Sequence, residues 1–173
     1  MKIQTKISVI FMLFYTITIN AQITDIEQDL DLASDSVFCP YLLGIVVSDV
    51  EKSAEWYEDN FGFEIIRRMN FPEYDSLQII HMRMGKVELE LIQKQTSFSI
   101  KKFVPNYNGF DKSPLRGISK IAFWVSDAET LANQIKKRNV KFLVNLYVNK
   151  EFAIKSFIIE DLDGNVLQFN QRL

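Results

Sequence analysis

Few residues of this sequence are suited to chemistry on their own. His81 is the only histidine of the 173-residue chain, so a histidine-dependent base or metal site must use it. Because side chains alternate along a strand, His81 and Arg83 are predicted to share one face. His81 is then either a general base or ligand contact on that face, or a structural residue. Lys120 and Trp124 share a face of another predicted strand, where the indole could stack on a flat ligand.

Several other kinds of chemistry are not indicated. The sequence has no phosphate-binding glycine loop, no Ser-His-Asp order and no Cys–His pair for nucleophilic catalysis. The formal net charge of -2 gives no basic footprint for nucleic acid. Cys39 is the only cysteine, so no disulfide forms within the chain. It is either a small buried hydrophobe or one half of an intermolecular disulfide.

The N-terminal 21 residues have the three parts of a secretory signal peptide. Lys2 and Lys6 precede an apolar run at residues 7–19, and Ala21 is a small residue at its exit. The run is shorter than the roughly 20 residues needed to cross a bilayer. We expect residues 1–21 to be removed and the protein to be secreted or periplasmic, without stable membrane insertion. An uncleaved anchor or a buried strand is the alternative, and residues 22–40 form a polar lead-in.

Two stretches of the chain show the same predicted order of one strand, one helix and three strands. Each helix follows a Ser-Asp pair; Ser48 and Glu51 have the spacing of a capping box, and Gly62 ends the first helix. The last two strands are joined through residues 161–165, in which Asp163-Gly164 is a strong hairpin signal. The predicted elements are 42–47, 50–61, 63–69, 77–84 and 87–92, then 118–125, 128–139, 142–148, 152–159 and 166–170.

The second stretch repeats the first at one offset. Residues 47–49 (Val-Ser-Asp) have the same sequence as residues 125–127, 78 positions later (125 − 47 = 78). Residues 90–92 fall opposite residues 168–170 at this offset. A shared order and a single offset predict duplicated βαβββ units, each with one sheet face to bury.

These segments also resemble a known family. Residues 42–53 (LLGIVVSDVEKS), followed by Trp-Tyr at 56–57 and Phe-Gly-Phe at 61–63, resemble the opening of a vicinal oxygen chelate module. This family includes glyoxalases, bleomycin-resistance proteins and extradiol dioxygenases. Residues 87–92 (VELELI) resemble the final strand of such a module. Residues 161–165 (DLDGN) resemble its Asp-Pro-Asp-Gly-Asn turn, with leucine in place of proline.

The resemblance covers residues 41–171 and implies an α+β fold. Two tandem βαβββ modules, residues 41–93 and 118–171, are expected to form a curved mixed sheet around a cleft. Residues 94–117 connect them and are rich in turn-forming residues. This connector is too long for an idle turn, so it is either a strap between the modules or a lid.

Metal-dependent members of the family hold one divalent ion with a His on each first strand and a Glu on each last strand. At the two His positions this sequence has Leu42 and Lys120, and at the two Glu positions it has Glu90 and Gln168. Leucine cannot coordinate a metal, and lysine would bring its own positive charge against the ion. Only Glu90 remains, so we expect no bound cofactor, with a divalent metal at an unusual site as the alternative.

The resemblance implies that Lys120 and Glu90 face each other across the cleft. One hypothesis is that the ammonium balances the carboxylate that a metal would otherwise neutralise. The alternative is that both are solvated surface charges.

Two functions follow from the resemblance. The first is metal-free binding of a small molecule, with Glu90, Lys120, Trp124, Gln168 and Arg83 as the ligand-binding residues. Metal-free bleomycin-resistance proteins act as dimers, so a homodimer is implied as one arrangement. The second is a lyase, isomerase or dioxygenase-related enzyme that uses His81, Lys120 or Glu90 in an unusual metal or acid–base site. Bound metal in the purified protein would separate the two.

Overall fold

The computed structural model describes residues 42–105, 107 and 116–173. The predicted signal peptide, the polar lead-in and Cys39 lie outside the described residues, as does part of the connector. No helix of the described residues is long and apolar enough to cross a membrane. The elements are β1 (Leu42–Val46), α2 (Val50–Phe61), β2 (Glu64–Phe71), β3 (Leu77–Met84), β4 (Val87–Gln93), a 3₁₀ turn (Ile100–Lys102), β5 (Ile121–Trp124), α3 (Ala128–Lys137), β6 (Phe142–Asn149), β7 (Ile154–Glu160) and β8 (Val166–Arg172).

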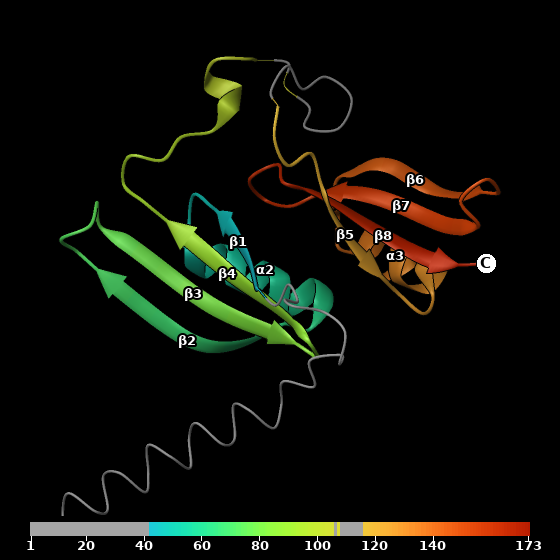
Figure 1. Ribbon diagram of the computed structural model, residues 1–173, viewed down its shortest axis with the longest axis horizontal. Helices are drawn as coiled ribbons and strands as arrows, with labels where there is room; N and C mark the ends of the chain where they lie inside the picture. Colours follow the sequence, from blue (N-terminus) through green and yellow to red (C-terminus); the bar gives the residue numbers. More distant parts are fainter. Residues whose placement is uncertain (1–41, 106, 108–115) are drawn as a thin grey trace, which may run out of the picture. The chain divides into compact units, whose positions relative to one another are not determined.

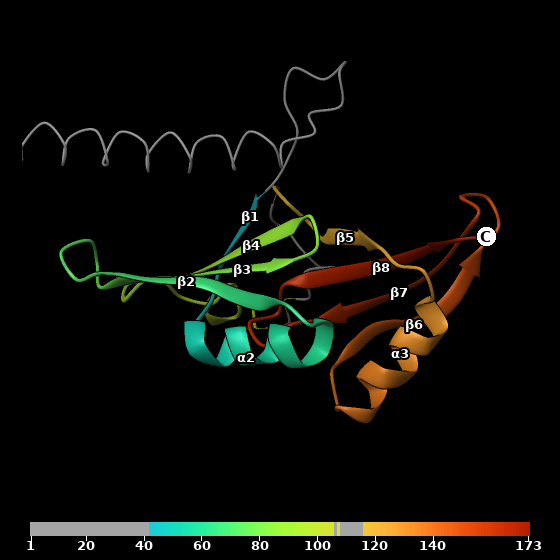
Figure 2. The ribbon, with the colours of Figure 1, turned by 90° about the horizontal axis from the view of Figure 1, so that it is seen from below.

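The strands form two four-stranded sheets of the same topology (Figure 1). The strand orders are β1-β4-β3-β2 and β5-β8-β7-β6, and in each sheet the first pair is parallel and the other pairs are antiparallel. Figure 2 shows α2 along one face of the first sheet and α3 beside the second. The predicted α+β fold of two βαβββ units is confirmed. Between the described strands, hydrogen-bonded ladders form only within a sheet, so side chains and turns join the units.

The first helix begins and ends at identifiable caps. Asp49 is the N-cap, and its carboxylate accepts a hydrogen bond from the Lys52 amide at 3.1 Å. The cap is therefore one residue later than the expected Ser48. Glu51 does not take part in a capping box, and its carboxylate instead accepts hydrogen bonds from Nε and Nη2 of Arg68. At the other end, Gly62 has a φ of 76° and donates its amide to Glu58, a conformation that glycine adopts without steric cost.

The duplication extends to individual hydrogen bonds. The Gln93 side chain accepts from the Val50 amide at 2.9 Å, and the Gln171 side chain accepts from the Ala128 amide at 3.0 Å. Each glutamine thus satisfies an early amide of its module's helix, a group without a partner inside the helix. The 78-residue offset also relates two backbone hydrogen bonds of 2.8 Å. The Val47 amide donates to the Ile92 carbonyl, and the Val125 amide donates to the Asn170 carbonyl.

A stack of phenylalanines joins the two units in one core. The Phe169 ring on β8 stacks on Phe157 and Phe123 of its own sheet, with centroids 5.0 and 5.5 Å away. It also stacks on Phe61 at the end of α2, 5.0 Å away. Buried residues of both sheets and both helices belong to this core cluster. Apolar burial is therefore shared between the units, and neither has a separate core.

The turn between β7 and β8 is fixed by one buried carboxylate. Asp161 accepts hydrogen bonds from the Tyr57 hydroxyl at 2.9 Å, from both nitrogens of Asn165 at 2.8 Å, and from the Asp163 amide at 3.0 Å. The turn spans five residues, 161–165, and of these only Gly164 has a positive φ, at 89°. The expected hairpin between the last two strands is confirmed, and the Asp161 side chain organises its five-residue turn.

Burial shifts the pKa of both partners in this contact. Burial raises the pKa of Asp161, while the hydrogen bonds from Asn165 and Tyr57 act in the opposite direction. Burial, followed by the negative charge of Asp161, raises the pKa of Tyr57 well above its usual value. The phenol therefore remains a hydrogen-bond donor at neutral pH.

Replacing Tyr57 with phenylalanine should destabilise the protein, because one buried oxygen of Asp161 loses its donor. We expect the free energy of unfolding to fall by roughly 1–3 kcal/mol, measured by urea denaturation. Tyr74→Phe is the matched control, because Tyr74 is 65% exposed. Equal denaturation midpoints for Tyr57→Phe and the control would show that this contact does not hold the units together.

Candidate functional site

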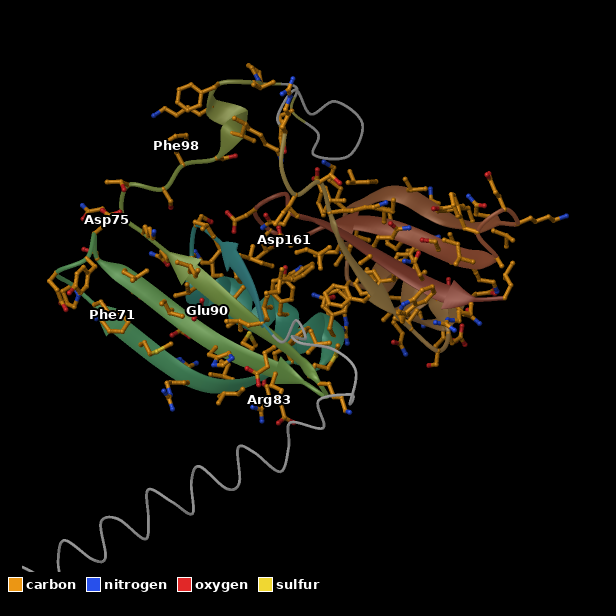
Figure 3. The ribbon with its side chains drawn as sticks, in the orientation of Figure 1. Phe71, Asp75, Arg83, Glu90, Phe98 and Asp161 are labelled. Carbon is orange, nitrogen blue, oxygen red and sulfur yellow. The ribbon has the colours of Figure 1, made fainter. Side chains whose placement is uncertain are left out.

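The candidate site begins on the face of the first sheet that points away from α2. Leu89 of β4 is buried in the core, whereas the alternating residues Glu88 and Glu90 project from the opposite face. Glu90 lies in the middle of this sheet, paired in register with Gly44 of β1 and His81 of β3 (Figure 3). The Glu90 carboxylate makes no ion pair with any described residue, so its charge is available to a ligand.

Next to Glu90, one carboxylate holds the two basic residues of β3. His81 Nε2 lies 2.7 Å from Glu88 Oε2, and Arg83 Nη2 lies 2.6 Å from Glu88 Oε1. The shared face predicted for His81 and Arg83 is therefore present, and Glu88 orients both side chains. The imidazole is held as in a carboxylate–histidine dyad, with its other ring nitrogen outside this contact.

Glu88 is the residue of this site that the sequence did not single out. Partial burial acts to raise its pKa, but the hydrogen bonds from Arg83 and His81 outweigh burial and lower the pKa below its ordinary value. Glu88 stays ionised at neutral pH and acts as an anchor. Its signal was the two-residue spacing from Glu90, together with the pairing opposite Arg83 that the short β3–β4 turn sets up.

The corresponding position in the second sheet is occupied by a buried amide. Gln168 of β8 is 6% exposed, and its Nε2 donates to Ser156 Oγ and to Asn170 Oδ1, each at 3.0 Å. Ala122 of β5 lies beside it in register, as Gly44 lies beside Glu90 in the first sheet. Gln168 therefore belongs to a small polar network rather than presenting a negative charge.

Lys120 lies just before β5, beside the 161–165 turn. It lines a small cavity of about 90 Å³ together with Tyr107, Ser119 and the turn residues Gly164 and Asn165. The structure does not bring Lys120 into an ion pair with Glu90. The Lys120 ammonium is exposed, and their pairing across the cleft stays a prediction.

Trp124 is the exposed aromatic residue of β5. It is 62% exposed, and the Arg172 guanidinium lies over its ring, 5.0 Å from the centroid. This cation–π contact orients the indole and covers part of it. A flat ligand that stacks on Trp124 would use the remaining surface.

The side chains at the family's four ligand positions differ in their capacity to bind a metal ion. Leu42 has no donor atom, Lys120 carries a positive charge, and the Gln168 nitrogen faces two oxygens of its own sheet. Glu90 is the only carboxylate among them. Within residues 42–105, 107 and 116–173, no group of three His, Cys, Asp or Glu side chains is arranged to hold a metal ion.

Comparison with known families gives one match. Residues 40–169 match the model described as the Glyoxalase/Bleomycin resistance protein/Dioxygenase superfamily. None of the curated proteins compared with the chain matches it.

Solved structures share the fold at low sequence identity. A glyoxalase family protein from Enterococcus faecalis is 19% identical with a TM-score of 0.64, covering 78% of this chain and 98% of its own. A glyoxylase/bleomycin resistance protein/dioxygenase domain from Frankia sp. EAN1pec is 15% identical with a TM-score of 0.64, covering 80% and 94%. The fosfomycin resistance protein FosX from Listeria monocytogenes is 11% identical with a TM-score of 0.58, covering 80% and 96%. These similarities establish the fold.

Replacing Glu88 with glutamine should lower stability in a pH-dependent way. The folded-state pKa of Glu88 is depressed, so its contribution is complete above the ordinary glutamate pKa of about 4.3 and is lost as the pH falls through the lower folded value. We expect a loss on the order of 1 kcal/mol at pH 7 that shrinks toward pH 3, measured by denaturant unfolding. Glu73→Gln, an exposed hairpin residue, is the control. A Glu88→Gln deficit that stays constant down to pH 3 would contradict the assignment.

Proposed function

Because the chain belongs to the Glyoxalase/Bleomycin resistance protein/Dioxygenase superfamily, we propose that it binds a small molecule at the open faces of its two sheets, without the family's usual divalent ion. The observation that carries this proposal is the set of side chains at the family's four metal-ligand positions. Of the four positions that would ligate the ion, only Glu90 offers an anionic oxygen. A single carboxylate is too few ligands for a stable divalent site in a protein.

The side chains that remain are suited to binding. Glu90 offers a carboxylate in the middle of one sheet that forms no ion pair with the residues that the structure describes. Trp124 offers an exposed aromatic surface beside the other sheet. Lys120 adds an exposed ammonium next to the 161–165 turn. A few polar groups beside an aromatic surface give a ligand both orientation and apolar contact.

We propose that Lys120 takes over part of the metal's electrostatic role. With no ion near Glu90, a bound ligand would lie between a negative and a positive side chain. Its polar groups would then be recognised at both ends, by the Glu90 carboxylate and the Lys120 ammonium. Arg83 would provide a hydrogen-bond donor on the first sheet. Both N–H groups of the Gln168 amide are engaged by Ser156 and Asn170, so Gln168 would contribute its carbonyl oxygen as an acceptor on the second sheet.

The second candidate function is acid–base catalysis, and the His81–Glu88 contact favours it. A histidine held by a carboxylate at 2.7 Å can take a proton from a substrate carbon or oxygen and return it, as a lyase or isomerase requires. Arg83 shares the same carboxylate, which reduces the support that Glu88 gives to a protonated imidazole.

Binding can be tested by a thermal-shift screen of small molecules against the protein lacking residues 1–21. A ligand at 100 times its Kd adds about 2.7 kcal/mol of stability. We expect Glu90→Gln and Lys120→Ala each to weaken the affinity for any hit at least about tenfold, since each removes a charged contact. The thermal shift that the hit produces should fall accordingly. Lys150→Ala, an exposed turn residue, is the control. Hits that bind both variants as tightly as the wild type would place the binding site elsewhere.

We further propose that the protein is exported, secreted or periplasmic, and acts as a homodimer. Support for export is the basic start, apolar run and small exit residue of segment 1–21. Support for a dimer is the family resemblance, together with the exposed Val46 and Trp124 on the two edge strands.

Export predicts a defined N-terminus. Expression of the full chain in a secreting host should give a mature protein that begins at Gln22, because Ala21 ends the signal-like segment. Intact-mass spectrometry of the extracellular or periplasmic fraction measures this directly. An Ala21→Arg variant should block cleavage. Recovery of the wild-type chain with residues 1–21 still attached, in the cytoplasmic fraction, would contradict export.

A further inference from the structure

A second and larger cavity lies on the helix side of the protein. It has a volume of about 590 Å³ and is formed by α2, the residue that ends α3, and the β7–β8 turn. The strand residues of the candidate site do not line it, so it is separate from that site. Its main lining residues are Glu55, Trp56, Asp59, Asn60, Arg138 and Leu162.

Asn60 is a polar residue of this cavity with an unused acceptor. It is 9% exposed, and its Nδ2 donates to the Trp56 carbonyl at 2.8 Å. Its Oδ1 is buried and has no hydrogen-bond partner in the described part of the chain. A buried carbonyl without a donor costs free energy, and a ligand N–H group that reaches it after a rotation of the Asn60 side chain would remove that cost.

Two carboxylates also line the cavity, and both belong to α2. Glu55 and Asp59 are one helical turn apart on α2 and form no ion pair with any described residue. Like charges at this spacing repel, and Asp59 also lies in the last turn of α2, at the negative end of the helix dipole. The two basic side chains of the lining are engaged: Lys52 pairs with Asp49 at 3.0 Å, and Arg138 donates to the Asp59 carbonyl. A bound cation would relieve the repulsion between the carboxylates.

The aromatic wall of the cavity is held in a fixed orientation. Trp56 contacts Tyr57 and Phe61 edge to face, with centroid distances of 4.9 and 5.4 Å. The indole is half-buried, and it lines the cavity together with Leu162, which is 57% exposed. An indole face attracts a cation, and its apolar surface accepts an aromatic or aliphatic body.

We propose that this cavity binds an organic cation, namely a primary amine that carries an aromatic or aliphatic body. The ammonium donates a hydrogen bond to Asn60 Oδ1 and lies near the carboxylates of Glu55 and Asp59. The apolar body packs against Trp56 and Leu162. One ligand of this class satisfies the buried acceptor, the unpaired charges and the exposed apolar surface together.

The test compares three probes of similar size on the protein lacking residues 1–21. By isothermal titration calorimetry, 2-phenylethylamine should bind at least about tenfold more tightly than neutral 2-phenylethanol or anionic phenylacetate, because only the amine pairs with the carboxylates. Glu55→Gln should weaken amine binding about two- to fivefold. Glu58→Gln removes the same charge from the same helix but does not line the cavity, so it should leave binding unchanged.

The proposal would be overturned if the amine showed no saturable binding at millimolar concentration, or if the alcohol bound as tightly as the amine. Preferential binding of phenylacetate would also overturn it, by indicating a site governed by Arg138 and Lys52. So would equal weakening of amine binding by Glu55→Gln and Glu58→Gln. Amine binding that is lost in Glu90→Gln but kept in Glu55→Gln would also overturn it, by moving the amine to the sheet face. The proposed function does not depend on any of these results.

Discussion

The hydrogen bond between the Tyr57 hydroxyl and the Asp161 carboxylate is the contact on which both candidate sites depend. Burying a carboxylate is costly unless its oxygens are fully hydrogen-bonded, and Asp161 meets that requirement only where α2 and the β7–β8 turn lie together. A second tie, from the Ser48 amide to the Asp163 side chain at 3.0 Å, holds the same turn to the first unit. The turn then contributes Leu162 to the helix-side cavity, and Gly164 with Asn165 to the small cavity beside Lys120.

Much of the fold was predictable from the sequence, because its signals are local. Alternation, caps and a single offset gave the strands, the helices and the duplication, and Gly62 ends α2 as expected. The N-cap was misplaced by one residue, since Ser48 and Asp49 are both good caps and only the bond from Lys52 decides between them. The Asp-Gly pair correctly predicted the hairpin between β7 and β8. It did not predict the role of Asp161 in that turn, because the partner Tyr57 is distant in sequence.

The candidate site was less predictable, because it depends on contacts between residues that are distant in the sequence. The faces of His81, Arg83 and Glu90 followed from alternation. The role of Glu88 depends on the register between β3 and β4, which the sequence does not state. The buried network of Gln168 with Ser156 and Asn170, and the unpaired acceptor of Asn60, arise from packing between segments that are far apart along the chain or on different elements.

The proposed function depends on the side chains at the family's four metal-ligand positions, which are residues 42, 90, 120 and 168. Substitutions at three of them can restore the ligand types of the family. Combining Leu42→His, Lys120→His and Gln168→Glu restores the family's ligand types beside Glu90, whereas the wild-type chain has one of the four. The most direct measurement is the binding of Zn²⁺, Ni²⁺ or Mn²⁺ to both proteins by isothermal titration calorimetry after chelation and dialysis. We predict that the triple variant binds one equivalent of metal and that the wild type shows no stoichiometric binding. Stoichiometric binding by the wild type that Glu90→Gln abolishes would contradict it.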